Sequence, residues 1–214
     1  MEITYLGHAC FKLRGKSATV VTDPFDPDMV GVKFPKISAN IVTVSHQHKD
    51  HNYSAGVSDR EIVISGPGEY ELKGIKILGV STYHDSEGGK DRGKNTIYRI
   101  EIDRVSIVHL GDLGHKLNDK EVDRLDGVDV LLVPVGGEYT INSEEAAMVA
   151  SQIEPKIIIP MHYNRPDLNQ QNFAKLTGVE TFLKEMGKTG VTPLPKLVVN
   201  RDKLPLETTV VVLE

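Results

Sequence analysis

The sequence predicts a layered α/β fold, and the order of its apolar segments is the main evidence. The first half consists mainly of short β-branched or aromatic runs, separated by Gly, Asp and Pro residues as in strands joined by turns. From about residue 117 onwards, helical patterns alternate with continuous apolar runs. Helices and strands are therefore interspersed over one core, which favours layers of each.

Short strands are predicted in the first half, at residues 3–6, 10–13, 19–22, 41–45, 62–65, 75–80, 96–102 and 106–109. Turn residues recur at short intervals between these runs. This spacing is typical of antiparallel strands that follow one another in meanders.

The second half is predicted to alternate between helices and strands. Its elements are, in order, a helix at 118–125, a strand at 128–133, a helix at 143–153, a strand at 156–159, a helix at 181–188 and a strand at 208–213. Asn142 is a suitable N-cap because Glu145 follows three residues later, and Pro155 ends the same helix. Strand, helix and strand in this order form a βαβ unit with a parallel pair. No repeat or linker interrupts the chain, so we expect one domain over 1–214.

The composition argues against several classes of partner. Hydrophobic residues make up 39% and charged residues 26%, which is ordinary for a globular protein and sufficient for a buried polar site. The formal net charge of −5 argues against non-specific binding of nucleic acid or an anionic membrane. It does not exclude an enzyme that acts on a phosphodiester, because metal ions supply local positive charge.

Cysteine usage and the N-terminus predict a cytoplasmic location. The chain has 1 cysteine, Cys10, which excludes an internal disulfide framework and suggests a buried structural thiol. No basic region followed by an apolar run opens the sequence, and no apolar stretch approaches the ~20 residues of a membrane span. We expect no membrane association, and the sequence leaves the oligomeric state open.

The strongest chemical signal is a cluster of polar residues that follows the predicted strand at 41–45. Three imidazoles and one carboxylate fall within six residues, namely His46, His48, Asp50 and His51. This combination suits Zn, Mn, Fe or Ni. His46 and His48 point the same way in an extended chain and can share one ion, whereas Asp50 and His51 lie beyond a turn and can serve a second. A histidine-rich surface loop is the alternative, although the whole chain has only 8 histidines.

The H-x-H-x-D-H arrangement resembles that of the metallo-β-lactamase superfamily of metallohydrolases. Three later elements of that family follow in the same order: a histidine after a strand at His84, a Gly-Asp pair at Asp112 and a late histidine at His162. In addition, residues 7–9, 109–115 and 134–137 are similar to a small branch of the ascorbate-6-phosphate lactonase type. The resemblance extends over most of the chain.

The resemblance implies a four-layer αββα sandwich in which two mixed sheets are flanked by helices. It implies two divalent metal ions, for which zinc is favoured and manganese, iron or nickel are alternatives. The implied ligands are His46, His48 and His84 for the first ion, Asp50, His51 and His162 for the second, and Asp112 as the bridge. A metal-bridged hydroxide would then attack the substrate, so no serine or cysteine nucleophile is required.

Simpler explanations exist for the three isolated ligands. His84 is followed by Asp85 and Ser86, which would also suit a surface loop. Asp112 is compatible with a plain Gly-Asp turn, and His162 with an ordinary loop position.

Three residues are expected to take part in catalysis: Asp50, His8 and His115. His8 follows a strand end and is predicted either to contact the substrate, to supplement the ligands or to be a hydrogen-bonded structural histidine. His115 comes three residues after Asp112 and is predicted to support a ligand or donate a proton, with a purely structural role as the alternative. His109 lies within an apolar strand, which favours a core histidine with satisfied nitrogens.

Further positions have two interpretations each. Asp23 precedes a proline, and it either orients a ligand histidine, as the resemblance implies, or forms an Asp-Pro turn. Residues 26–36 form either a mobile flap over the site or a packed loop. Tyr139 follows a buried strand and a pair of glycines, which suggests a substrate contact.

The leading hypothesis is a metal-dependent hydrolase that cleaves a phosphodiester, a lactone or a related ester. A non-catalytic metal-binding or regulatory module is the alternative, although no ligand of the set is missing. A di-iron redox enzyme is disfavoured, because redox relatives replace the second histidine of the motif, here His48, with a carboxylate. Polymer-cleaving relatives carry an added clamp or cap, and none is inserted here, so a small-molecule substrate is favoured over nucleic acid.

Overall fold

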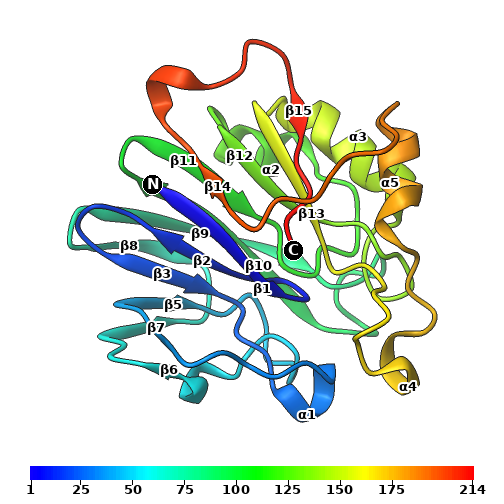
Figure 1. Ribbon diagram of the computed structural model, residues 1–214, viewed down its shortest axis with the longest axis horizontal. Coiled ribbons are helices and arrows are strands. Elements are labelled where there is room, and N and C mark those ends of the chain that lie inside the picture. Colours follow the sequence, from blue (N-terminus) through cyan, green and yellow to red (C-terminus); the bar gives the residue numbers. More distant parts are fainter.

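Two mixed β-sheets packed face to face form the centre of the molecule (Figure 1). The structure is a computed structural model that describes residues 1–214. The strands of the first sheet lie in the order β14 (Leu197–Val198), β1 (Glu2–Gly7), β2 (Cys10–Arg14), β3 (Thr19–Thr22), β5 (Ile41–Thr43) and β7 (Ile62–Ile64). The strands of the second sheet lie in the order β15 (Thr209–Val210), β13 (Ile157–Met161), β12 (Val130–Pro134), β11 (Val105–His109), β10 (Lys94–Ile102), β9 (Ile75–Tyr83) and β8 (Gly68–Leu72).

The inner faces of the two sheets make the largest apolar core. Side chains alternate between the two faces of a strand, so Ile3 and Tyr5 of β1 point inward while Glu2 and Thr4 do not. Opposite them, the second sheet contributes a layer of buried aliphatic residues and one aromatic ring, namely Ile75, Ile77, Tyr98, Ile100, Ile102, Ile107, Val130, Leu132 and Ile159. This core holds the sheets, and therefore their strand ends, in a fixed relation.

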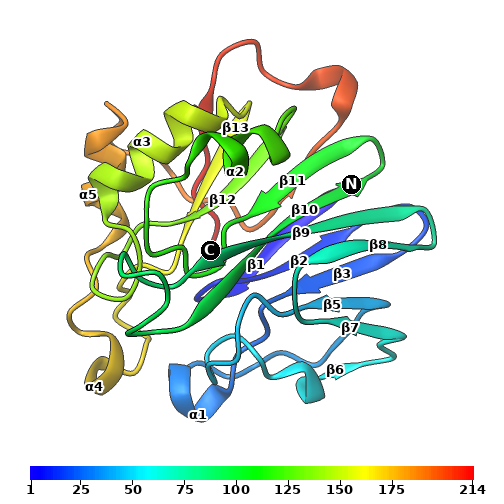
Figure 2. The ribbon, with the colours of Figure 1, turned by 180° about the vertical axis from the view of Figure 1, so that it is seen from behind.

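Helices cover the outer face of the second sheet (Figure 2). They are α2 (Asp119–Arg124), α3 (Ser143–Ile153) and α5 (Val179–Glu185). Both α2 and α3 begin with a capping box, and that of α3 joins Asn142 to Glu145 as predicted. None of the helices combines the length and the apolar composition that crossing a membrane requires.

The layer over the first sheet is thinner than the resemblance implies. It consists of the single-turn helices α1 (Pro27–Val30) and α4 (Gln170–Phe173) and of a two-stranded sheet, β4 (Ile37–Ser38) with β6 (Val57–Ser58). Val30, Ile37 and Phe173 close an apolar cluster against Val21 and Val42 of the sheet. In both ribbon views α1 and α4 lie at the same end of the molecule.

The predicted fold class is confirmed, but the strand directions are only partly as expected. The βαβ unit of β12, α3 and β13 is present with its parallel pair. Strands β1, β2 and β3 form an antiparallel meander, as do β8 to β11. The expectation of antiparallel pairing was wrong for β5, which runs parallel to both β3 and β7. The connections on either side of β5 are long enough for parallel crossovers, whereas short turns join the strands of the meanders, except for the longer loop between β9 and β10.

The segment at 208–213 is mostly irregular, with only β15 in the sheet, and the short strands β4, β6, β8 and β14 were not predicted. The short 3-10 helices at Ser54–Gly56 and Arg201–Lys203 also lack a pattern of their own. Such short elements are fixed by their neighbours rather than by local apolar periodicity.

Tyr98 of β10 connects the two sheets beneath the polar cluster. Its ring is fully buried, and its hydroxyl lies 3.0 Å from the carbonyl oxygen of Val44 and 3.2 Å from that of Ile64. The same hydroxyl accepts a hydrogen bond of 2.8 Å from the backbone N–H of Gly66. Tyr98 thus fixes the ends of β5 and β7. The end of β5 lies directly before the residues at 46–51.

We predict that Tyr98→Phe lowers the free energy of unfolding by about 1–3 kcal/mol, because the ring stays in place while buried backbone groups lose their partner. Urea denaturation measures this change. The control is Tyr70→Phe, whose hydroxyl is partly exposed and makes only 3.3 Å contacts. An equal loss in both variants would show that Tyr98 contributes no special link between the sheets.

Candidate metal centre

The predicted ligands converge from both sheets at the ends of four strands. His46, His48, Asp50 and His51 lie in the turn after β5 of the first sheet, while His84, Asp112 and His162 follow β9, β11 and β13 of the second. The turn after β5 begins at Val44, earlier than the predicted strand end at 45. The two sheets therefore contribute complementary halves of one site.

One group of three histidines matches the first predicted ligand set. His46, His48 and His84 each offer a ring nitrogen, and these atoms lie within 4.8 Å of one another. The ring centroids are 4.6 Å apart for His46 and His48, and 5.0 Å apart for His48 and His84. His46 and His84 are buried and His48 is exposed, so this group faces solvent on one side.

A second group contains the other predicted set with one addition. Asp50, His51 and His162 offer ligand atoms within 4.8 Å of one another, together with His8. All of these residues are buried. Asp50, His51 and His162 were the predicted set, and for His8 a supplementary ligand was one of the three interpretations.

Asp112 lies between the two groups, and its Oδ2 atom is the centre of the arrangement. This oxygen is 3.2 Å from Nε2 of His51, 3.3 Å from Nε2 of His84 and 3.3 Å from Nε2 of His162. It is 3.8 Å from Nε2 of His46. One carboxylate therefore contacts imidazoles of both groups, which is the position that a bridging ligand needs.

The residues present fit divalent metal ions. Nε2 of His46, His51 and His162 and Oδ1 of Asp112 are buried without any hydrogen-bond partner. Buried polar atoms are rarely left unpaired, because each costs about 1–3 kcal/mol. Several such atoms directed at one place indicate a cation, and a set dominated by imidazole suits zinc and related transition metals.

The electrostatics of the site favour a cation as well. Burial lowers the pKa of His46 to about 3, so its ring nitrogens stay free of a second proton at neutral pH. Burial opposes ionisation of Asp112, but His162 and His51 outweigh it and hold the pKa of this carboxyl well below its usual range. Burial likewise acts against a charge on His51, yet Asp112 and Asp50 raise its pKa well above the usual value. The carboxylates thus attract positive charge, which a metal would supply in place of that proton.

Asp23 holds the motif residues in place. Its Oδ1 accepts a 2.8 Å hydrogen bond from the backbone N–H of Ser45, and its Oδ2 accepts one from the Ser45 hydroxyl. The same Oδ2 is 2.8 Å from Nδ1 of His51, which leaves Nε2 directed at the centre. Of the two sequence interpretations for Asp23, the structure shows the contact with a ligand histidine.

Asp112 is held by a residue that sequence reasoning missed. Oδ1 of Asn95 accepts a 3.0 Å hydrogen bond from the backbone N–H of Asp112, and its Nδ2 donates to Leu110 and Thr82. The neighbouring Gly111 has φ of 58°, and a Cβ there would lie 2.3 Å from Oδ1 of Asn95. An asparagine inside an apolar strand was the available signal, because strands rarely favour this residue.

Backbone strain accumulates at the same place. His8, Asp23 and His162 have φ values of 55°, 41° and 53°, which non-glycine residues seldom adopt. Such conformations persist where the surroundings enforce them, and they concentrate at functional sites. Nδ1 of His8 and both ring nitrogens of His162 also lack hydrogen-bond partners.

His8 is fully buried behind Asp50 and does not line the pocket. Its Nε2 lies 3.1 Å from Oδ2 of Asp50, and its ring packs on that of Phe173 with centroids 4.8 Å apart. Burial lowers the pKa of His8 to about 4, so the neutral ring donates its Nε2–H to the carboxylate. This position does not permit the direct substrate contact that was one of the predicted roles.

His115 lies outside the pocket. Its Nε2 accepts a 3.2 Å hydrogen bond from the backbone N–H of Tyr83, and its Nδ1 is 2.8 Å from the carbonyl oxygen of Lys116. The structure thus places His115 against the strand end that carries His84, with both nitrogens engaged by the backbone. His109 is buried between the carbonyl of Ala9 and the N–H of Gly111, as expected of a core histidine.

A cavity of about 440 Å³ opens beside the predicted ligands. Of the twelve lining residues, four are predicted ligands and the others form its outer wall, namely Met29, Gln47, Lys49, Arg92, Tyr139, Gln171, Asn172 and Phe173. Tyr139 therefore lies where the sequence had suggested. The segment at 26–36 is packed against the chain near α4. The carbonyl oxygen of Val30 accepts from the backbone N–H of Asn169, and that of Met29 accepts from Nδ2 of Asn172.

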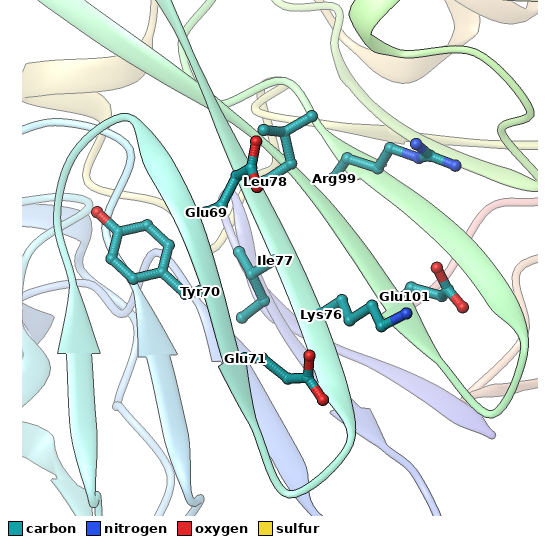
Figure 3. Close-up of a pocket in the computed structure, with 8 residues that line it drawn as sticks. All are labelled: Glu69, Tyr70, Glu71, Lys76, Ile77, Leu78, Arg99 and Glu101. Atoms are coloured by element: carbon teal, nitrogen blue, oxygen red, sulfur yellow. The ribbon is translucent and has the colours of Figure 1, made fainter.

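A second hollow, of about 390 Å³, lies on the outer face of β8, β9 and β10 (Figure 3). Its charges alternate across the strands, with Lys76 in register between Glu71 and Glu101. It contains no histidine, and its groups make no cluster that could hold a metal ion. The chemistry of this molecule is therefore concentrated at the other cavity.

Comparison with known proteins identifies the arrangement. Residues 2–162 match the family model described as beta-lactamase superfamily domain. A UPF0173 metal-dependent hydrolase of Thermoplasma acidophilum is 30% identical over 206 residues, which cover 83% of this chain and 91% of the relative. A Thermococcus onnurineus protein of the same description is also 30% identical, over 83% of this chain and 92% of its own.

A crystallised protein of Thermotoga maritima has the same fold, with a TM-score of 0.81 and 40% identity over 99% of this chain and 97% of its own. It has been proposed to be a Zn-dependent hydrolase of the metallo-beta-lactamase superfamily. The narrower resemblance to the ascorbate-6-phosphate lactonase type stays a prediction.

We predict that Asp23→Asn weakens metal binding by about 10–100-fold, because an amide no longer fixes His51 in the required orientation. Competition with a chromophoric chelator measures the affinity. Asp26→Asn is the matched control, since Asp26 caps α1 and touches no ligand. Unchanged affinity in Asp23→Asn would contradict the positioning role.

The metal-free protein is predicted to lose stability as the pH falls from about 6.5 to 4. Unfolded histidines take up a proton near pH 6.5, whereas burial lowers the folded pKa of His46 to about 3 and that of His8 to about 4. The unfolded state therefore binds more protons in this range. The free energy of unfolding falls by up to about 1.4 kcal/mol per pH unit for each such group. His51 does not change this pH dependence. Its pKa is raised in the folded state, so its stabilising contribution is fully present below about pH 6.5 and is lost only at higher pH.

Urea denaturation of chelator-treated protein between pH 7 and 4 tests this dependence. The variant His8→Gln should show a shallower decline than the wild-type chain. A stability that is constant over this range would refute the neutral, buried state of these rings.

Proposed function

We propose that this chain, a metal-dependent hydrolase of the metallo-β-lactamase superfamily, hydrolyses an ester bond of a small molecule. In this proposal it uses two divalent ions, with zinc as the favoured metal. The bond would be that of a lactone, a phosphodiester or a related ester. The supporting observation is the position of Asp112, whose Oδ2 contacts histidines of two separate ligand groups.

The proposed ligands are the predicted ones, with His46, His48 and His84 on one ion, Asp50, His51 and His162 on the other, and Asp112 shared. Ions bound there would supply an activated water and would polarise the bond to be cleaved. Burial lowers the pKa of His46 to about 3, so this ligand is free of a second proton at neutral pH. The protein also keeps Asp112 ionised at the centre.

Asp50 and His8 act as a pair in this proposal. The Nε2–H of His8 donates to Oδ2 of Asp50, which fixes the carboxylate and leaves its other oxygen available. We therefore assign His8 a positioning role and Asp50 a role in contact with the reacting groups at the pocket floor. His115 would position the strand end that carries His84.

No serine, threonine or cysteine lines the cavity as a competing nucleophile. Cys10 is fully buried, and burial raises the pKa of its thiol well above the usual value. The hydroxyl of Ser45 is already bonded to Asp23. These observations favour direct attack by water over a covalent intermediate.

The size and charge of the molecule favour a small substrate over nucleic acid. The cavity of about 440 Å³ suits a metabolite-sized ligand. The net charge of −5 opposes non-specific attraction of a phosphate backbone. One domain and a cytoplasmic location remain part of the proposal, in keeping with a single free thiol.

The non-catalytic alternative is less well supported. A protein that only senses metal needs no open cavity beside its ligands, yet His48, Asp50 and Asp112 all line the pocket. The redox alternative would require a carboxylate in place of His48.

We predict that His48→Ala and Asp112→Asn each lower kcat/KM by at least about 100-fold, because each removes a ligand that faces the substrate. Hydrolysis of bis-p-nitrophenyl phosphate and of a lactone panel measures activity, and elemental analysis of the purified protein gives the metal content. Lys120→Ala, on the exposed surface of α2, is the control. Turnover that survives both variants and exhaustive chelation would refute the proposal.

A further inference from the structure

We propose that Arg92 binds an oxyanion of the substrate, a carboxylate or phosphoryl group separate from the bond that is cleaved. The inference rests on the proposed function and names the class of substrate for the same cavity. Arg92 lines this cavity together with the proposed metal ligands His48 and Asp50.

The backbone of Arg92 is fixed by a buried carboxylate. Oδ2 of Asp85 accepts hydrogen bonds from the N–H groups of Arg92 at 2.8 Å and Asp91 at 3.1 Å. Oδ1 of the same residue accepts from Gly89 at 2.8 Å and from Glu87 at 2.9 Å. Asp85 directly follows the ligand His84, so one folded loop sets both the metal ligand and the arginine.

The guanidinium group of Arg92 is also held in place. It lies 4.9 Å from the centroid of the Tyr139 ring, over which it stacks. One of its nitrogens donates to the carbonyl oxygen of Glu138 at 3.4 Å. Tyr139 is anchored in turn, because its hydroxyl donates to the carbonyl oxygen of Asn172 at 2.9 Å.

Most of the donor capacity of Arg92 is unused. A guanidinium has five N–H donors in a planar fork, and only one contact with an oxygen is made here. Arg92 forms no ion pair, although acidic residues outnumber basic ones by 30 to 25 in the chain. A cation left unpaired beside an active-site cavity is available for a ligand.

Beside the apolar side chains of Met29 and Phe173, the outer wall carries further polar groups. Lys49 adds a second cation, and the amides of Gln47 and Gln171 add donors, whereas the amide of Asn172 already donates to Met29. The cavity lining contains no carboxylate other than Asp50 and Asp112, which belong to the metal site. A fork of N–H donors beside an ammonium group fits a carboxylate or a phosphoryl group of the substrate. The same groups offer no specific contact to an uncharged alkyl substituent.

Isothermal titration of the metal-loaded protein with small acids tests the proposal without any turnover. Succinate, glutarate and adipate have a second carboxylate that butyrate, pentanoate and hexanoate lack. We expect the wild-type protein to bind at least one dicarboxylate about 10-fold or more tightly than the matching monocarboxylate, because charge-assisted bonds to arginine are strong. Comparison of 3-phosphonopropionate with glutarate distinguishes a phosphoryl from a carboxylate preference.

Arg92→Gln should abolish the preference for the second charged group and leave the affinity for monocarboxylates unchanged. Arg92→Lys should retain part of it. Tyr139→Leu should weaken the preference several-fold, whereas Tyr139→Phe keeps the stacked ring, loses only the hydrogen bond to Asn172 and should retain most of the preference. Lys90→Gln removes one positive charge from the same loop but lies outside the cavity, so it should behave like the wild-type protein.

Two results would overturn the inference. The first is an absence of preference in the wild-type protein at every chain length and for the phosphonate. The second is an equal loss for both acid classes in Arg92→Gln, which would indicate a structural arginine. Because binding is measured directly, these results are independent of hydrolysis, and an inactive protein that still shows the Arg92-dependent preference would contradict the proposed function alone.

Discussion

A single buried carboxylate, Asp112, imposes the strongest demand on this structure. Placing a charge in an apolar interior is costly unless opposite charge and hydrogen bonds surround it. The fold satisfies the demand with four imidazoles whose nitrogens lie 3.2 to 3.8 Å from one oxygen of Asp112. The strained backbone at His8 and His162, the glycine at Gly111 and the Asn95 side chain all follow from bringing these groups together.

The support for the site is arranged in pairs of polar residues. Asp23 contacts His51, and His8 contacts Asp50. Each of these two proposed ligands is thus held by a buried residue that does not line the cavity. Asp85 folds the loop after His84 and Tyr98 joins the ends of β5 and β7. None of these contacts needs a ligand, so the protein alone provides the precise geometry that a metal site requires.

The sequence could indicate which residues would meet at the proposed metal site. Each of them lies just after an apolar strand, and the family resemblance added His84, Asp112 and His162 to the His46–His51 cluster. Asn95 and Arg92 could not be predicted, since their roles depend on which strands and loops are neighbours in space. Parallel pairing of β5 was missed for a similar reason, because strand direction is not encoded in a short apolar run. The thin layer formed by α1 and α4 has too few residues for helical periodicity.

The division of the site between the sheets has a consequence for the whole molecule. His46 to His51 extend from the first sheet, while His84, Asp112 and His162 extend from the second. A bound ion would therefore cross-link the two halves much as a disulfide would, but reversibly and by mass action. The fraction of folded chains would then follow the concentration of free metal, so that supply of the ion would govern how long the protein survives proteolysis as well as its activity.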